Sequence, residues 1–99
     1  MHFKLDASNL TFHAYEGERL IDYIFAIIQL ERQGDQLLVH MQYREWGLHC
    51  MRIYYRLKNI CRVVGHPGMR NGLLVKTFVM PYSEKNEEYV INEILAIEI

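Results

Sequence analysis

Cysteine and proline are both scarce in this 99-residue chain, with two of each. A secreted domain of this size that depended on disulfides would usually carry more cysteines, so the sequence favours a reduced, cytoplasmic protein. The spacing of Cys50 and Cys61 is still compatible with a disulfide between neighbouring strands. We recognise no secretory signal, because the opening MHFKLDASNL contains no apolar segment of the kind that a signal peptide needs.

Long apolar runs are missing as well. The longest apolar-rich stretch, LIDYIFAIIQL, has 11 residues and includes Asp22, whereas a membrane-spanning helix needs about 20. We therefore expect no membrane partner. The composition, with 51% hydrophobic and 23% charged residues, is typical of a globular protein, and the length fits a single domain over residues 1–99.

Catalytic and metal-binding motifs are also missing. Cys50, Cys61 and His66 have the spacing C-x10-C-x4-H, which lacks the closely spaced cysteine pair typical of structural zinc sites. Neither cysteine lies in a recognised nucleophile signature, and no pair of carboxylates indicates acid–base chemistry. We predict a protein that is not an enzyme and needs no metal or cofactor. A thiol or metal-dependent enzyme is the less favoured alternative.

Charge is distributed unevenly along the chain. The net charge is only −1, but residues 44–76 hold seven basic residues and a single acidic one, Glu45. The segments on both sides are acidic. A basic middle between acidic ends predicts a surface that attracts an acidic partner.

Alternating patterns predict several strands. They cover HFKL and LTFHAY near the N-terminus, then QLLVHMQYRE, HCMRIYYRLK, and a pair formed by NICRVV and LLVKTFVMPY. The side chains of residues 49–58, HCMRIYYRLK, alternate between apolar and polar. This period of two predicts a half-buried antiparallel strand with a basic polar side.

Two further segments fit either a helix or a strand. Residues 18–33 have apolar side chains at the spacing of one helix face, and we favour a helix that ends at Gly34. The same segment is rich in strand-forming residues, and Gly34-Asp35 also suits a two-residue hairpin turn. Residues 84–97 are β-branched near their end, but Ser83 is a suitable helix cap and glutamates follow it, so again we favour a helix.

The predicted elements combine into an α+β fold. We expect an antiparallel sheet of four to six strands with one or two helices packed on one face. Residues 10–31, LTFHAYEGERLIDYIFAIIQLE, resemble the start of the N-terminal domain of type VI secretion spike proteins. The shared features are an apolar strand with Phe-His, a Glu-Gly turn and a second apolar element. The likeness covers about a fifth of the chain and implies no site residues.

The best-supported site is the basic, aromatic-rich strand face. Its residues are Arg44, Trp46, Arg52, Tyr54, Arg56 and Lys58. Tyr, Trp, Met and Arg are enriched at interface cores, so we predict a small protein-interaction module such as an inhibitor, immunity protein, adaptor or phage-type regulator. Its partner would be an acidic protein surface or a second copy in a dimer.

Two other interpretations of this face stay open. Positive charge and aromatic rings also suit a nucleic-acid-binding module, which is the alternative function. The acidic first and last segments are also able to lie against the basic residues, which would then pair with Glu88, Glu93 or Glu98.

The loop GHPGMRNG, residues 65–72, is a second candidate site. Its glycines can turn backbone N–H groups inward to bind an anion, and Arg62, His66 and Arg70 would add positive charge. Asn71-Gly72 before an apolar run is at the same time the signal for a tight turn between strands. We favour the turn.

Overall fold

The computed structural model describes residues 1–17, 23–65 and 68–97. Within them the chain forms seven strands and two helices. The strands are β1 (His2–Asp6), β2 (Thr11–Tyr15), β3 (Ile24–Gln33), β4 (Gln36–Tyr43), β5 (Arg62–Val63), β6 (Gly68–Arg70) and β7 (Leu73–Pro81), and the helices are α1 (Leu48–Ile60) and α2 (Glu84–Leu95). In the described ranges, no helix is long and apolar enough to cross a membrane.

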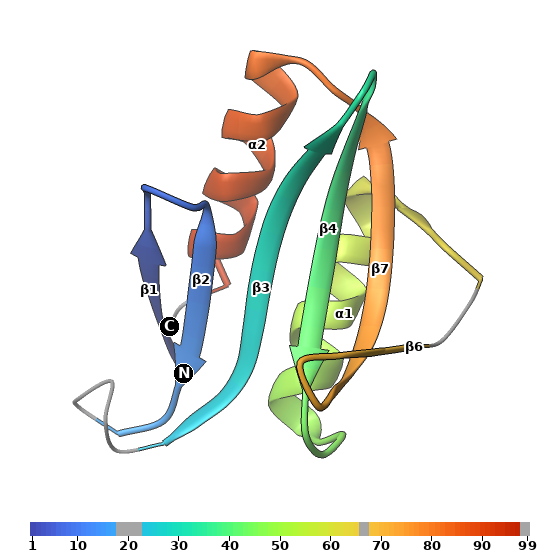
Figure 1. Cartoon of the computed structure of the whole chain (residues 1–99). Helices are drawn as coiled ribbons and strands as arrows, with labels where there is room; N and C mark the ends of the chain where they lie inside the picture. Colours follow the sequence, from blue (N-terminus) through green and yellow to red (C-terminus); the bar gives the residue numbers. More distant parts are fainter. Residues whose placement is uncertain (18–22, 66–67, 98–99) are drawn as a thin grey trace.

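All seven strands join one antiparallel sheet in the order β1-β2-β3-β4-β7, and both β5 and β6 pair with β7. The first four strands follow one another as a meander, and β7 adds beside β4 after α1. Both helices lie on the same face of the sheet, and none of the described residues forms a helix on the other face (Figure 1). The predicted α+β fold is confirmed, with one strand more than the four to six expected, because β3 and β6 were not among the predicted strands and only one predicted strand, over residues 49–58, is a helix instead.

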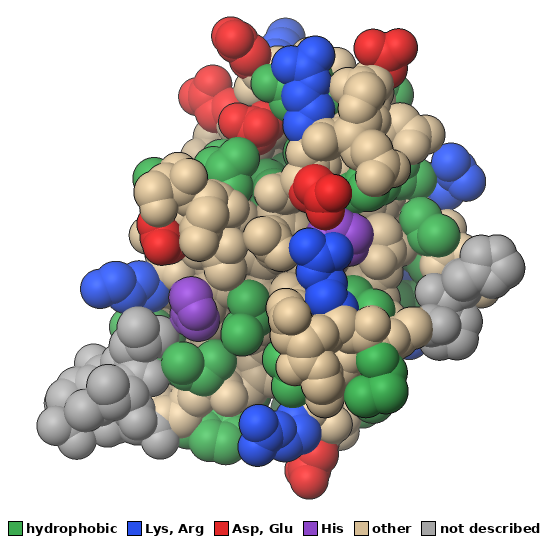
Figure 2. Space-filling view, in the orientation of Figure 1, with side chains coloured by type: hydrophobic (Ala, Val, Ile, Leu, Met, Phe, Trp, Pro, Cys, Tyr) green, Lys and Arg blue, Asp and Glu red, His purple; other side chains and the backbone are tan. Residues whose placement is uncertain are grey.

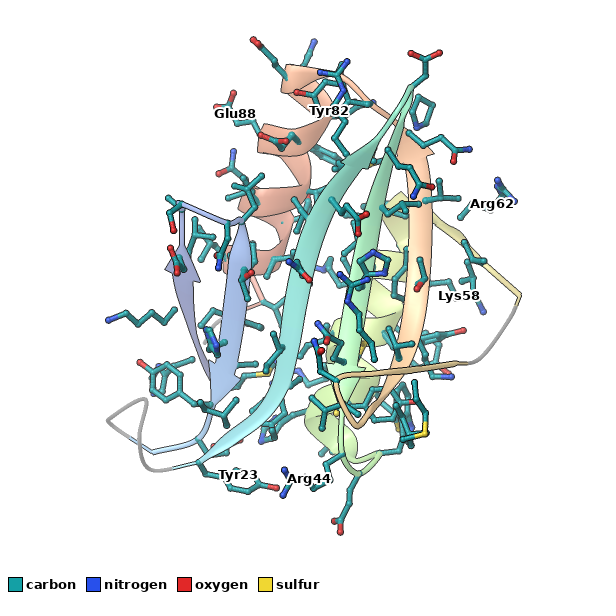
Figure 3. The ribbon with its side chains drawn as sticks, in the orientation of Figure 1. Tyr23, Arg44, Lys58, Arg62, Tyr82 and Glu88 are labelled. Carbon is teal, nitrogen blue, oxygen red and sulfur yellow. The ribbon has the colours of Figure 1, made fainter. Side chains whose placement is uncertain are left out.

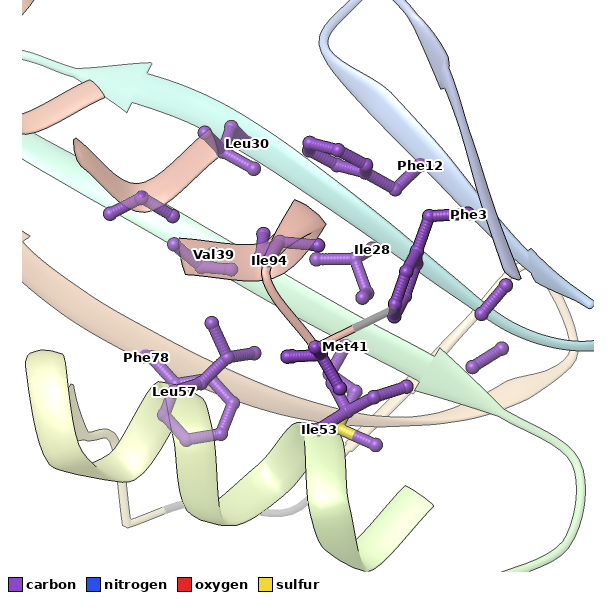
Figure 4. Close-up of a cluster of buried hydrophobic side chains, with 14 of the residues drawn as sticks. Phe3, Phe12, Ile28, Leu30, Val39, Met41, Ile53, Leu57, Phe78 and Ile94 are labelled. Carbon is purple, nitrogen blue, oxygen red and sulfur yellow. The ribbon is translucent and has the colours of Figure 1, made fainter. Parts of the chain in front are cut away.

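The core lies between the sheet and the two helices. Alternate side chains of each strand point to this face, and Figure 4 shows them meeting the buried sides of the helices. The labelled side chains are Phe3, Phe12, Ile28, Leu30, Val39, Met41 and Phe78 from the strands and Ile53, Leu57 and Ile94 from the helices. Burying one such side chain contributes roughly 1.5–3 kcal/mol to folding.

Residues 49–58 lie in α1, so the predicted strand HCMRIYYRLK is wrong. The buried residues are Cys50, Ile53 and Leu57, which are three and four positions apart and therefore share one helix face. Met51 and Tyr55, which belong to the apolar side of the predicted strand, are exposed. The segment carries both periods, and half of its residues are good helix formers with Ile53 alone β-branched.

The favoured helix over residues 18–33 is also wrong where the structure describes that segment. Residues 24–33 form β3, and residues 18–22 lie outside the described residues. Ala26, Ile28 and Leu30 are buried, which is the period of two that a strand requires. Gly34, with φ of 60°, occupies the turn to β4, in which Gln33 pairs with Gln36. The hairpin alternative is therefore the one observed.

The other local predictions are confirmed. β1, β2 and β4 lie where alternation placed strands, and β5 pairs with β7 as predicted for NICRVV and LLVKTFVMPY. The backbone N–H of Asn86 donates to the hydroxyl of Ser83 at 2.9 Å, so Ser83 caps α2. Asn71 and Gly72 have φ of 55° and 77°, and two positive values in succession are what a tight hairpin turn such as β6–β7 needs.

Candidate functional site

The predicted basic face is divided because its central residues lie on a helix. Arg52 and Arg56 are four positions apart on one side of α1, and Tyr54 and Lys58 are four apart on another side. A strand would have presented all four side chains together. The prediction of one continuous basic stripe is therefore wrong. The structure has two groups, one with Arg52 and Arg56 and one with Tyr54 and Lys58.

The arginine group faces α2 and the residues that follow it. The guanidinium of Arg56 donates to the carboxylate of Glu93 on α2 at 2.8 Å. Arg52 lines a groove of about 360 Å³ between α1 and the residues after α2. The interpretation that the acidic last segment pairs with part of the basic residues is confirmed for Arg56. Such a half-exposed ion pair contributes only about 0–1 kcal/mol to stability.

The second group forms what we call the aromatic–lysine cluster, which consists of Trp46, Tyr54, Tyr55, Lys58 and Lys76. The ring of Tyr54 lies at its centre, with centroid distances of 5.6 Å to Trp46 and 5.5 Å to Tyr55. Beneath these rings, Phe78 lies 5.7 Å from Tyr54, and Tyr43 lies 5.2 Å from Trp46. Ring pairs of this kind contribute about 0.5–1.5 kcal/mol beyond their buried area, so the cluster is held in place by the core.

Two ammonium groups lie over these rings. Nζ of Lys76 is 5.2 Å from the ring centre of Trp46 and 5.3 Å from that of Tyr54. Nζ of Lys58 is 5.9 Å from Tyr54 and 6.0 Å from Tyr55, within the range of a cation–π contact. In the part of the chain that the structure describes, no carboxylate pairs with either lysine.

Lys76 was not among the predicted site residues. In sequence it is one polar residue within the apolar strand LLVKTFVMPY, 30 positions from Trp46. Its contact with Trp46 depends on the pairing of β7 with β4, in which Lys76 lies opposite Met41. Alternation along the strand partly indicated the position of Lys76. It places Lys76 on the same side of β7 as the buried Phe78, which is the side that faces the helices.

Arg44 lies apart from the cluster. It follows Tyr43 at the end of β4 and lies near Tyr23 (Figure 3), with which it lines a groove of about 380 Å³. Of the six predicted residues, the structure brings together Trp46, Tyr54 and Lys58. Arg44, Arg52 and Arg56 lie elsewhere on the surface.

The candidate anion loop does not form one basic site among the described residues, and His66 lies outside them. Arg62 is exposed on β5 (Figure 3). The guanidinium of Arg70 donates to the side-chain oxygen of Gln29 at 3.1 Å and lies 3.6 Å from the carboxylate of Glu31. The charge of Arg70 is therefore directed to the sheet, away from Arg62.

Glu31 and Arg70 belong to a polar network on the sheet face that has no helix. The ring of His40, only 7% exposed, lies 2.9 Å from the carboxylate of Glu31 and 3.1 Å from the hydroxyl of Thr77. Figure 2 shows basic, acidic and histidine side chains touching near the middle of this face. Both ring nitrogens of His40 have partners, as a buried histidine requires, and the network links β3, β4, β6 and β7.

The two cysteines are free thiols. Burial raises the pKa of the Cys50 thiol, and burial beside Met80 raises the pKa of Cys61 from its ordinary value of 9.0 to about 11. A nucleophilic cysteine needs the opposite shift, since the thiolate is the reactive form. Within residues 1–17, 23–65 and 68–97, no three His, Cys, Asp or Glu side chains are grouped to hold a metal ion.

These thiols should react slowly in the folded protein. In a Cys50→Ala variant, we expect a neutral alkylating reagent at pH 8 to modify Cys61 about 100-fold more slowly than free cysteine, because two pKa units lower the thiolate fraction by that factor. The rate should rise about tenfold per pH unit up to pH 10. Denaturing urea should restore the rate of free cysteine. Rapid labelling without urea would contradict the burial of this thiol.

No family model, no curated protein and no solved structure matches this chain. The resemblance of residues 10–31 to type VI spike proteins is therefore a local likeness of sequence.

Proposed function

We propose that this protein is a non-enzymatic interaction module that binds an acidic segment of another protein at the aromatic–lysine cluster. The observation that carries this proposal is the position of Lys58 and Lys76, whose ammonium groups lie over aromatic rings without a carboxylate partner among the described residues. Complementary charge increases the association rate and the specificity of such an interface.

Exposed apolar side chains extend the cluster beyond Lys76. Leu74 lies opposite Tyr43 in the pairing of β4 with β7, and Met69 lies opposite Leu74 in the β6–β7 hairpin. Leu74, Met69 and Trp46 are all exposed large apolar residues. An acidic segment that also carries apolar side chains would thus contact the lysines and rings of the cluster through its acidic residues. Its apolar side chains would contact the exposed apolar residues beside the cluster. Protein interfaces with anchoring residues usually combine these two kinds of contact.

The ring geometry favours a peptide over a nucleic acid. Trp46 and Tyr54 meet at 77° and Trp46 and Tyr43 at 66°, so neighbouring rings do not form a parallel platform for successive bases. Nucleic-acid binding without sequence preference uses such stacking together with a long basic groove. The arginines that would lengthen the basic surface lie away from the cluster, and Arg56 is paired with Glu93.

Binding of a defined probe tests this proposal. We expect a fluorescein-labelled peptide of alternating glutamate and leucine residues to bind, as measured by fluorescence anisotropy at low salt. The double change Lys58→Glu and Lys76→Glu should weaken binding at least about tenfold, which corresponds to roughly 1.4 kcal/mol. A Lys4→Glu variant, with the same type of charge change at an exposed site on β1, should bind like the unaltered protein.

Two outcomes would contradict the proposal. Equal peptide binding by the double lysine variant would exclude the cluster as the site. Tighter binding of a mixed-sequence single-stranded DNA, with an affinity that falls steeply as salt is raised, would favour the nucleic-acid alternative.

A further inference from the structure

We propose that the helix layer is the interface of a two-fold symmetric homodimer, in which α1 of each copy packs against α2 of the other. This goes beyond the proposed function, because it concerns a second copy of this chain; the two surfaces share Tyr55, which belongs to the aromatic–lysine cluster and also lines the groove beside Arg52. Three features of the layer carry the inference: the opposite charges of the two helices, their exposed apolar side chains, and the groove between them.

The two helices carry opposite charge. α1 contains Arg52, Arg56 and Lys58 and no acidic residue, whereas α2 contains four glutamates and one lysine. Figure 3 places Lys58 and Glu88 on opposite sides of the molecule. In the described residues the two helices share one ion pair, Arg56 with Glu93. The charges of Arg52, Glu84 and Glu88 are thus not neutralised between the helices of one copy.

Each helix also exposes large apolar side chains. On α1 they are Leu48, Met51 and Tyr55, and on α2 they are Tyr89 and Leu95. Leu48 is 72% exposed, the largest value among the exposed large hydrophobic residues of the described chain. On α1 the spacing of three and four positions places these side chains together on one side of the helix, and on α2 the two exposed side chains lie next to the buried Val90 and Ile94. Apolar side chains rimmed by charged ones are typical of protein interfaces.

The groove beside Arg52 joins these features. Its lining combines α1 residues Leu48, Met51 and Tyr55 with Ala96 and Ile97, which follow α2. The volume of about 360 Å³ offers room for apolar side chains of an incoming helix. In charge, the helix α2 of a second copy fits this basic groove, because it carries four glutamates and one lysine.

In a two-fold symmetric dimer, the contact between α1 of one copy and α2 of the other occurs twice. When one copy faces another across a two-fold axis, the basic α1 of each meets the acidic α2 of the other, so both contacts are attractive. Because each copy offers both helices in the same interface, the assembly closes at two. The sheet face without helices stays outside this interface (Figure 1).

A charge-reversal experiment tests the dimer. We expect sedimentation velocity at roughly 100 µM protein to show mostly dimer, as a micromolar Kd requires. Arg52→Glu alone and Glu88→Arg alone should each raise the dimer Kd about tenfold or more, because each change places like charges together at two symmetric contacts. An equal mixture of the two variants should form a heterodimer, because both of its contacts again join opposite charges.

The outcomes separate this proposal from the proposed function. A monomeric unaltered protein, or a dimer that both variants form as readily, would overturn the helix-layer interface. Failure of the mixture to form a heterodimer would also overturn it. Lys4→Glu should leave the dimer unchanged. Binding of the acidic peptide by the Arg52→Glu variant should be retained, since Arg52 lies outside the aromatic–lysine cluster.

Discussion

Replacing Phe12 with alanine should lower the free energy of unfolding by about 3–5 kcal/mol, the usual cost of removing a buried phenylalanine ring. Phe12 has no exposed surface. Its ring meets that of Phe3 edge to face at 6.4 Å, between β1, β2 and the helix layer. Since a domain of this size is stable by only about 5–15 kcal/mol, much of its stability should be lost. Urea denaturation followed by circular dichroism measures the effect.

Met69→Ala provides the matched control, because it also removes a large apolar side chain. Met69 is 68% exposed on β6, and substitutions at such positions usually change stability by less than about 0.5 kcal/mol. Equal destabilisation by the two variants would contradict the core described for this fold.

Tyr55→Pro should cost about 3 kcal/mol or more, because proline in the interior of a helix removes a backbone donor and clashes with the preceding turn. Tyr55 lies in the middle of α1 and its side chain is exposed, so the loss would come from the backbone. The matched variant Tyr55→Ala keeps the donor and should cost less than about 1 kcal/mol. Thermal denaturation of both variants measures the difference. If proline were tolerated as well as alanine, the helical assignment of residues 48–60 would be contradicted.

The elements that the sequence predicted correctly depend on local chemistry. Ser83 caps α2 through a bond to a residue three positions away, and Asn71-Gly72 adopts the positive φ angles of its own turn. β1, β2 and β4 alternate without a competing helical period. In each case the interactions that determine the structure lie within a few residues, so a single sequence contains them.

The two wrong predictions concern segments that carry both periods. In residues 49–58, Ile53 belongs equally to the alternating pattern and to the i, i+3, i+7 pattern with Cys50 and Leu57. In residues 24–33, apolar side chains are so dense that a helix face and a strand face can both be drawn. Tertiary packing determines which of the two structures each segment adopts. Residues 24–33 pair with β2 and β4 as a strand, and α1 packs as a helix on the sheet.

Three of the five residues of the aromatic–lysine cluster were predictable, because they lie close together in the sequence. Trp46, Tyr54 and Lys58 lie within 13 positions of one another, and their residue types indicated an interaction surface. Lys76 reaches the cluster only because β7, which follows α1 in the sequence, pairs with β4 in the sheet. The loss of Arg52 and Arg56 from the group follows directly from the change of strand to helix.

Trp46 offers the most direct test of the aromatic–lysine cluster as a binding site. It is the only tryptophan, it is 43% exposed, and its ring contacts both Tyr54 and Lys76. We would titrate the unlabelled acidic peptide and follow Trp46 fluorescence at low and moderate salt. We expect a saturable change that weakens as salt is raised and disappears in the Lys58→Glu, Lys76→Glu variant. A flat Trp46 signal under conditions in which anisotropy shows the peptide bound would contradict binding at the cluster.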